Sequence, residues 1–165
     1  MIKLLVLDVD GTLTSGDLTF DSNGVEFKTF NVKDGLAIAS WTKKLNLKVA
    51  IITGRNSPIV QKRAEELGVQ HIYQGVHNKD EILANILKEE NLTFANVASI
   101  GDDLNDYKML KKSALSFCPA DGVKEIRELV NVVCVKNGGA GAVREMIEYI
   151  LKYEDNEDVI FKLWQ

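Results

Sequence analysis

Short apolar runs of strand length alternate with stretches of helical periodicity along most of the chain. The apolar runs lie at residues 2–7, 48–52, 71–73, 97–100, 115–117 and 132–135. The helical stretches lie at residues 35–45, 58–67, 79–90, 104–111, 123–130 and 142–153. Strands that alternate with helices favour a parallel sheet, because each helix forms a right-handed crossover to the next strand. The pattern therefore predicts an α/β fold, a doubly wound (Rossmann-like) parallel sheet with helices on both faces.

One segment, residues 15–32, interrupts this alternation. Its two β-prone runs are joined by a turn that contains Asn23-Gly24. An Asn-Gly turn between such runs is typical of a β-hairpin. We expect this hairpin to project from the end of the first strand, within a single domain over residues 1–153. A C-terminal tail, residues 154–165, follows; its apolar residues 159–164 predict that it docks on its own core or on a neighbour.

Composition argues against several classes of function. With 165 residues, 45% of them hydrophobic, and a net charge of −4, the chain is typical of one globular domain and lacks the basic balance of nucleic-acid-binding proteins. No apolar run reaches the roughly 18 residues that span a membrane. Cys118 and Cys134 lie in apolar surroundings without metal-ligand spacing, so we expect buried free thiols in a reducing compartment, the cytoplasm.

Two carboxylates directly follow the first apolar run. Asp8 and Asp10 are one residue apart, so an extended chain would point both side chains to the same face. Carboxylates that close repel each other unless a cation lies between them, and Mg²⁺ is a hard cation that suits oxygen ligands. Gly11 permits a sharp turn, and we expect the Thr12 hydroxyl to hold this turn by a local hydrogen bond. The alternative is a solvated turn at a strand end.

A second group of acids, Asp102, Asp103 and Asp106, follows the fourth apolar run. Ligands of open α/β sheets bind at the carboxyl ends of the strands, so we expect this group to lie beside Asp8. The predicted metal ligands are Asp8, Asp10 and Asp102, with Asp106 orienting the site or pairing with Lys79. Asp103 is expected to cap the following helix or to contact a metal-bound water.

Residues 8–14 resemble the first signature, D-x-D-G-T-x-T, of the haloacid dehalogenase superfamily of phosphohydrolases. Residues 101–106 resemble its G-D-x-x-x-D signature. The resemblance implies that Asp8 is phosphorylated during the reaction and that Asp10 is a general acid and base. It also implies that Asp102 completes the metal site and that Asp106 supports it.

Thr53 and Lys79 lie where this superfamily has its second and third motifs. Thr53, followed by Gly54, ends an apolar run and can donate its hydroxyl to a phosphate oxygen. Lys79 follows Asn78, the expected N-cap of a helix. The resemblance implies that the Lys79 ammonium neutralises charge on the transferring phosphoryl group.

Two arginines are candidates for binding a carboxylate on the substrate. Arg55 and Arg63 are eight residues apart, about two helical turns, so both guanidinium groups are expected to face one direction. The alternative for Arg63 is an ion pair with a nearby glutamate on the helix surface. His71 is expected to be structural, and His77 is a candidate for a contact on the substrate side.

Longer strings resemble one subfamily, the 3-deoxy-D-manno-octulosonate 8-phosphate phosphatases. They lie at residues 26–35, 52–55, 74–79, 101–106 and 138–145. The resemblance implies a Mg²⁺-dependent phosphomonoesterase without a cap domain, which acts on an acidic sugar phosphate in lipopolysaccharide precursor synthesis. It also implies a homotetramer in which the hairpins assemble around the symmetry axis.

Other functions remain open at the level of sequence. The closest alternative substrate is a nine-carbon N-acylneuraminate (or KDN) 9-phosphate. A phosphoacceptor signalling domain also uses clustered Asp, Thr and Lys in an α/β fold, but it needs no acid or base at Asp10. A non-catalytic module that only binds a sugar phosphate is a third possibility.

Overall fold

The computed structural model describes residues 1–154 and 158–165. In this part of the chain, six strands form one parallel sheet in the order β5-β4-β1-β6-β7-β8. The strands are β1 (Leu4–Leu7), β4 (Lys48–Ile52), β5 (His71–Tyr73), β6 (Val97–Ile100), β7 (Leu115–Cys118) and β8 (Val132–Val133). The predicted doubly wound sheet is confirmed, and the strand order reverses at β1, which lies between β4 and β6.

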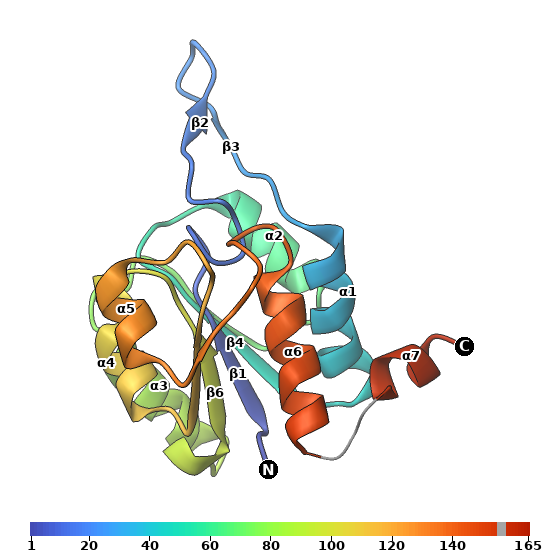
Figure 1. Cartoon of the computed structure of the whole chain (residues 1–165). Helices are drawn as coiled ribbons and strands as arrows, with labels where there is room; N and C mark the ends of the chain where they lie inside the picture. Colours follow the sequence, from blue (N-terminus) through green and yellow to red (C-terminus); the bar gives the residue numbers. More distant parts are fainter. Residues whose placement is uncertain (155–157) are drawn as a thin grey trace.

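Helices cover both faces of the sheet (Figure 1). Leu5 and Leu7 of β1 pack on one face, in a core shared with α1 (Val32–Ala39), α2 (Pro58–Glu66) and α6 (Ala142–Tyr153). Leu4 and Val6 pack on the other face, with α3 (Lys79–Glu89) and α4 (Tyr107–Lys112). Neighbouring strand residues point to opposite faces, so a strand buried on both sides is a continuous apolar run. The helix α5 (Lys124–Leu129) packs beside α4.

The predicted hairpin projects from the body of the molecule (Figure 1). Its strands, β2 (Thr19–Phe20) and β3 (Glu26–Phe27), are antiparallel. The Asp21 side chain closes the turn by accepting hydrogen bonds from the backbone N–H groups of Asn23 and Val25, both at 2.8 Å. In the chain, the hairpin follows β1 and the loop after it, and it leads back to the body of the molecule at α1.

The largest differences from the predicted helix boundaries concern the first helix and the helix after β6. The first helix begins at Val32, three residues before the predicted start at residue 35, because the Asn31 side chain accepts a hydrogen bond from the Lys33 backbone N–H at 2.8 Å. It continues after Ala39 as a π-helical segment, Ser40–Lys44. The helix expected at residues 104–111 opens with a 3₁₀ turn, Leu104–Asp106, before α4.

The last residues of the chain contact their own domain. The helix α7 (Val159–Leu163) is followed by Trp164, whose Nε1 donates a hydrogen bond to Ser40 Oγ at 2.8 Å. The Lys44 ammonium lies 4.4 Å from the centre of the same indole ring. Residues 155–157 of the predicted C-terminal tail lie outside the described residues. Across the two described ranges, none of the helices has both the length and the apolar character that crossing a membrane requires.

Candidate active site

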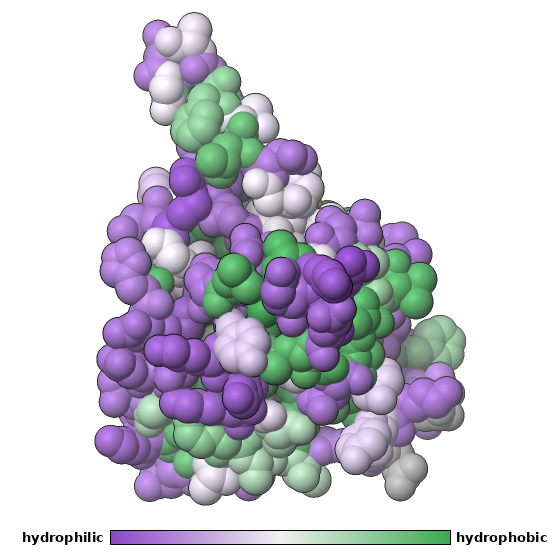
Figure 2. All heavy atoms as spheres, turned by 60° about the vertical axis from the view of Figure 1, so that its left-hand side comes forward, coloured by the Kyte–Doolittle hydropathy of each residue, from purple (hydrophilic) through white to green (hydrophobic). Residues whose placement is uncertain are grey.

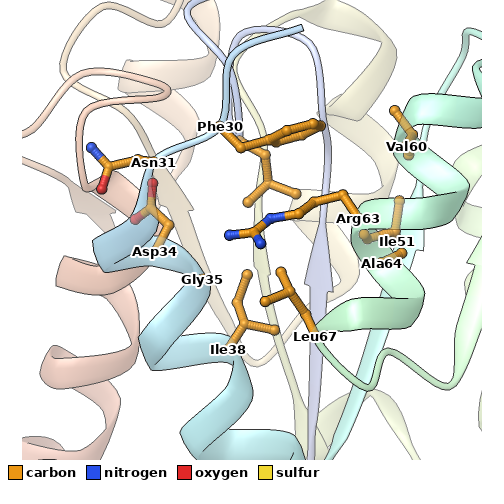
Figure 3. Close-up of a pocket in the computed structure, with 11 residues that line it drawn as sticks. Phe30, Asn31, Asp34, Gly35, Ile38, Ile51, Val60, Arg63, Ala64 and Leu67 are labelled. Carbon is orange, nitrogen blue, oxygen red and sulfur yellow. The ribbon is translucent and has the colours of Figure 1, made fainter.

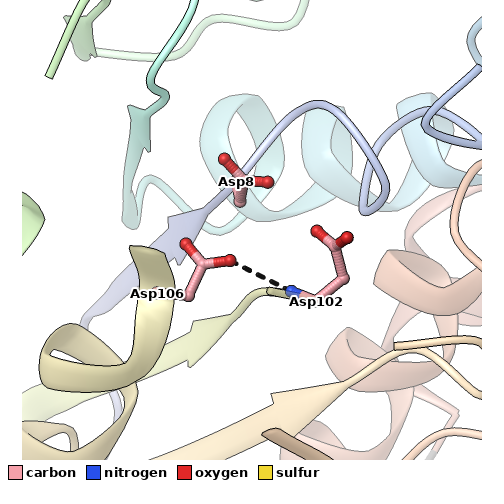
Figure 4. Close-up of side chains that lie close together, drawn as sticks. All are labelled: Asp8, Asp102 and Asp106. Carbon is pink, nitrogen blue, oxygen red and sulfur yellow. Dashed lines mark hydrogen bonds between the residues drawn. The ribbon is translucent and has the colours of Figure 1, made fainter. Parts of the chain in front are cut away.

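The two acid groups meet where β1 and β6 end. Asp8 stays hydrogen-bonded to the sheet, since its backbone N–H donates to the Ile100 carbonyl at 3.2 Å. Figure 4 shows Asp8, Asp102 and Asp106 gathered at this edge, and one oxygen from each carboxylate lies within 4.8 Å of the others. The expectation that the two acid groups lie side by side is therefore confirmed.

Lys79, the first residue of α3, is buried between two of these carboxylates. Its ammonium donates hydrogen bonds of 2.6 Å to Asp8 Oδ1 and of 2.6 Å to Asp106 Oδ1. The side chain is only 1% exposed. Asn78 occupies the N-cap position of α3 as expected, but its side chain accepts no capping hydrogen bond. The two carboxylates are thus the partners that hold the start of α3 at the site.

Asp106 also holds the loop that carries Asp102. Its second oxygen, Oδ2, accepts hydrogen bonds from the backbone N–H groups of Asp102 at 3.0 Å and Asp103 at 3.3 Å. The side chain of Asp103 accepts from the Leu104 backbone N–H at 2.7 Å, so Asp103 caps the 3₁₀ turn, the first of the two places expected for it. Asp106 therefore fixes both Lys79 and the backbone of the β6 loop.

The turn after Asp8 brings the two strand ends into direct contact. The carbonyl of Val9 accepts hydrogen bonds from the three backbone N–H groups of residues 12–14, at 2.9 to 3.1 Å. Gly11 has a φ of 94°, and a Cβ atom there would lie 2.1 Å from Asp102 Oδ2. Only glycine permits the two loops to approach this closely.

The prediction that the Thr12 hydroxyl forms a local hydrogen bond within the turn was wrong. The hydroxyl instead donates to Asp102 Oδ1 at 3.1 Å, across the gap between the β1 and β6 loops. The local role belongs to Thr14, whose hydroxyl oxygen accepts from the Gly11 backbone N–H at 3.3 Å. Because backbone hydrogen bonds already close the turn, Thr12 is left to orient a carboxylate of the neighbouring strand end.

The electrostatics of this group fit a divalent cation. Burial raises the pKa of Asp8 well above its usual value, the charge of Asp106 adds to this rise, and Lys79 opposes it. Burial and the charge of Asp106 likewise raise the pKa of Asp102 to about 6. Burial alone would lower the pKa of Lys79, but the charges of Asp8 and Asp106 outweigh it and raise that pKa.

With all three acids ionised, Asp8, Asp102, Asp106 and Lys79 together carry a formal charge of −3 + 1 = −2. A hard cation with oxygen ligands relieves the repulsion between these carboxylates. The donor set therefore fits Mg²⁺. The side chain of Asp10 is not part of the three-carboxylate group, so the expected contribution of Asp10 to a metal site would come from its backbone carbonyl.

The Asp10 side chain has a partner that sequence reasoning missed. The Lys28 ammonium, delivered by the hairpin, donates to Asp10 Oδ1 and lies 3.4 Å from Glu26 Oε1. Glu26 also accepts from Arg55 Nη2 at 2.8 Å. Burial alone would raise the pKa of Glu26, but the hydrogen bond from Arg55 and the charge of Lys28 lower it. The place of Lys28 in the hairpin was predictable from the sequence, but how far the hairpin folds back toward Asp10 was not.

The two arginines have different surroundings. Arg55 follows Thr53 and Gly54 at the end of β4, and its side chain is 45% exposed beside Glu26. Arg63 reaches from α2 toward α1, into a cavity of about 10 Å³ (Figure 3). It pairs with Glu66 at 3.3 Å, the alternative that the sequence left open for it. A cavity of this size holds about one water molecule, so Arg63 is packed against its own domain.

The other residues singled out in the sequence lie outside the three-carboxylate group. Thr53 is buried at the end of β4, where its backbone N–H donates to the Tyr73 carbonyl at 3.0 Å. His71 Nε2 lies 2.7 Å from Glu90 Oε1, as befits a structural residue. His77 is exposed in the loop before α3. Cys118 and Cys134 are buried free thiols, as predicted.

The chain is similar to one family of known proteins, both by a family model and by individual relatives. Residues 70–147 match the model of the haloacid dehalogenase-like hydrolases. The chain is 41% identical to the 3-deoxy-D-manno-octulosonate 8-phosphate phosphatase KdsC of Salmonella typhi, over 91% of this chain and 79% of the relative. It is 35% identical to KdsC of Haemophilus influenzae, over 96% of this chain and 87% of the relative.

A crystal structure of the 3-deoxy-D-manno-octulosonate 8-phosphate phosphatase from Moraxella catarrhalis, in complex with magnesium, phosphate and KDO, has the same fold. The TM-score is 0.94 at 39% identity, and the match covers 99% of this chain and 94% of the other. The cobalt-bound enzyme from Haemophilus influenzae matches with a TM-score of 0.89 at 35% identity, over 96% of this chain and 92% of the other.

The doubly wound sheet, the carboxylates at the ends of its central strands and the buried lysine beside them, taken together with these matches, show that the chain is a haloacid dehalogenase-like phosphatase. Within that superfamily, the chain belongs to the family of the 3-deoxy-D-manno-octulosonate 8-phosphate phosphatases. The superfamily and the subfamily indicated by the sequence motifs are both confirmed.

The raised pKa of Asp102 predicts how Mg²⁺ binding depends on pH. The folded protein holds this proton more tightly than the unfolded chain, so without a cation this group contributes less stability as the pH rises from about 4 to about 6. Mg²⁺ needs the ionised carboxylate, so its stabilising effect grows over the same range. We expect MgCl₂ to raise the melting temperature more at about pH 7.5 than at about pH 5.

Thermal melting with and without MgCl₂ at the two pH values measures this effect. Asp102→Asn should lose most of the Mg²⁺-induced shift, whereas Asp17→Asn, in the exposed hairpin, should keep it. An equal shift at both pH values would contradict the assignment of Asp102 as a metal ligand.

Proposed function

We propose that this phosphatase hydrolyses 3-deoxy-D-manno-octulosonate 8-phosphate to 3-deoxy-D-manno-octulosonate and phosphate, a step of lipopolysaccharide precursor synthesis in the cytoplasm. The observation that carries the proposal is the buried Asp8 carboxylate, held by Lys79 beside Asp102 where β1 and β6 end. Relatives that cover most of the chain carry this activity in their names, which supports the choice of substrate.

In the first half of the proposed reaction, one oxygen of Asp8 attacks phosphorus in line with the leaving oxygen. An Asp8–phosphorus bond forms and the bond between phosphorus and the sugar oxygen breaks. Asp10 gives its proton to the departing sugar oxygen, which leaves as an alcohol. The product of this half is an aspartyl phosphate on Asp8 and an ionised Asp10.

In the second half, Asp10 takes a proton from a water molecule as that water attacks the aspartyl phosphate. The bond between Asp8 and phosphorus breaks, inorganic phosphate leaves, and Asp10 is ready to donate its proton again. This division replaces one difficult displacement with two easier ones.

Other residues stabilise the charge that develops on the phosphoryl oxygens. When bound by Asp8, Asp102 and the backbone carbonyl of Asp10, Mg²⁺ supplies positive charge at those oxygens. Lys79 adds its ammonium from the start of α3, and Thr53 its hydroxyl from the end of β4. Arg55, and Arg63 after a rearrangement of its side chain, would bind the carboxylate of the sugar acid.

The proposed assembly is a homotetramer that forms through the hairpins. Apolar side chains on the hairpin are about half exposed: Leu18 at 50%, Phe20 at 52%, Val25 at 54% and Phe27 at 54%. Figure 2 shows hydrophobic side chains on the hairpin as it rises above the body of the molecule. Apolar groups gathered on a projecting element are typical of a protein interface.

A phosphate-release screen with Mg²⁺ tests the substrate. We expect the highest kcat/KM with 3-deoxy-D-manno-octulosonate 8-phosphate, a lower value with N-acylneuraminate 9-phosphate, and at least about tenfold lower values with hexose phosphates. Hexose phosphates lack the carboxylate, and one charge-assisted hydrogen bond is worth about 1.5–3 kcal/mol. Equal values for the acidic and neutral sugars would reject the proposed substrate class.

Substitution of the two acids of the β1 loop separates their roles. Asp8→Asn should abolish turnover, because no aspartyl phosphate can form. Asp10→Asn should keep the fold and slow turnover about 10²- to 10⁴-fold, the usual contribution of a general acid and base. Asp17→Asn is the matched control. Steady-state kinetics and thermal melting measure both effects, and near-normal turnover in Asp8→Asn would remove the covalent step.

A charge placed on the hairpin tests the assembly. Phe20→Asp should weaken association, because burial of a carboxylate in an apolar interface is unfavourable. Ser22→Asp, in the exposed turn, adds the same charge outside the apolar residues and should leave association unchanged. Sedimentation velocity distinguishes the species. A monomeric parent protein would reject the tetramer.

A further inference from the structure

The Lys28 side chain is almost fully buried although it comes from a hairpin that projects into solvent. It is 3% exposed, and Lys28 immediately follows β3 in the chain. Its ammonium donates to Asp10 Oδ1 and lies 3.4 Å from Glu26 Oε1. A lysine is rarely buried unless it is paired, and here both partners are carboxylates. The hairpin thus leaves the β1 loop next to Asp10 and returns to it with a cation.

We propose that Lys28 is a positioning residue for Asp10, an inference that rests on the acid and base role proposed above. By holding Oδ1, Lys28 fixes the rotation of the carboxyl group and leaves Oδ2 as the oxygen that carries the proton. The side-chain torsion that sets this rotation in aspartate is broad, so a free carboxyl group at this loop would sample many orientations. The Asp10 side chain is 19% exposed, so its surroundings alone leave room for such rotation.

The contact is compatible with both states of Asp10 in the reaction. An ammonium group has donors only, and Oδ1 accepts a hydrogen bond whether it is the carbonyl oxygen of the neutral acid or part of the carboxylate. During the first half-reaction the proton moves from Oδ2 to the sugar oxygen. During the second half it moves from water to Oδ2, and Lys28 keeps its own protons throughout.

Glu26 gives Lys28 a second anchor that does not depend on Asp10. Glu26 Oε1 accepts from Arg55 Nη2 at 2.8 Å, and Arg55 belongs to the loop after β4. The lysine is therefore fixed relative to two strand ends of the sheet, β1 through Asp10 and β4 through Glu26 and Arg55. This framework gives the general acid a defined orientation before the substrate arrives, which is what preorganised catalysis needs.

The dependence of the reaction on the leaving group tests the proposal. Hydrolysis of a sugar phosphate needs the acid, because an alkoxide is a poor leaving group, whereas 4-nitrophenyl phosphate releases a stable phenolate without it. The value of kcat/KM covers the steps through departure of the leaving group. For Lys28→Met we expect kcat/KM to fall about 10- to 100-fold for 3-deoxy-D-manno-octulosonate 8-phosphate and by less than about threefold for 4-nitrophenyl phosphate.

Matched variants complete the experiment. Lys88→Met, an exposed lysine at the opposite end of α3, should change neither value. Lys28→Arg keeps a cationic donor and should recover part of the loss on the sugar phosphate. The ratio of the two kcat/KM values within one preparation does not depend on the fraction of folded protein, so partial unfolding of Lys28→Met leaves the test valid.

Two further measurements separate this inference from the proposed function. Asp10→Asn should show the same preference for the nitrophenyl ester, and more strongly; if it does not, the acid role of Asp10 fails and the role of Lys28 fails with it. If Asp10→Asn shows the preference and Lys28→Met does not, only the positioning role is overturned. Calorimetric titration with Mg²⁺ alone should give the same affinity for Lys28→Met as for the parent protein, and a loss of Mg²⁺ affinity would overturn the proposal.

Discussion

The structure depends on one buried ammonium group that lies between two buried carboxylates. Lys79 binds Asp8 and Asp106 at 2.6 Å each, and by doing so it joins β1, the loop after β6 and the start of α3. Taking these charges out of water is costly, and removal of one partner from such a group typically costs about 3–5 kcal/mol because the others are left buried and unpaired. A fold that maintains this arrangement keeps two strand ends at a fixed separation. The same fixed separation brings the oxygens of Asp8, Asp102 and Asp106 within reach of one cation.

Close approach of backbones gives this edge of the sheet its shape. A Cβ atom at Gly138 would lie 1.9 Å from the carbonyl oxygen of Gly11, and one at Gly101 would lie 2.3 Å from Asp106 Cγ. The loops before α6, after β1 and after β6 therefore pack against one another where no larger residue fits. The glycine-rich stretch at residues 138–141 packs against the β1 loop, and the Gly139 backbone N–H donates to the Thr12 carbonyl at 3.0 Å. These contacts support the loop that follows Asp8 from the side of α6.

The sequence predicted features that depend on local pattern or on the general rules of parallel sheets. The ranges of β4, β5, β6 and α6 agree with those expected, and the meeting of Asp8 with Asp102 follows from the pairing of two neighbouring strands. Prediction from the sequence failed where a side chain could bond either to a local partner or to a distant one. Thr12 bonds across the gap to Asp102, since the backbone already closes its turn. The contact of Lys28 with Asp10 depends on how far the hairpin folds back, which no local pattern encodes.

The chain has two tryptophans, and both belong to or contact the π-helical segment Ser40–Lys44 that follows α1. Trp41 is fully buried, with Nε1 donating to the Lys48 carbonyl at 3.1 Å, whereas Trp164 is 49% exposed against Ser40 and Lys44. Tryptophan fluorescence of this protein therefore reports on the contact of α7 with the segment Ser40–Lys44, through Trp164, and on the buried core around Trp41. The emission of Trp164 would shift to longer wavelengths when the C-terminal helix detaches, while chemistry at the carboxylates remains spectroscopically silent.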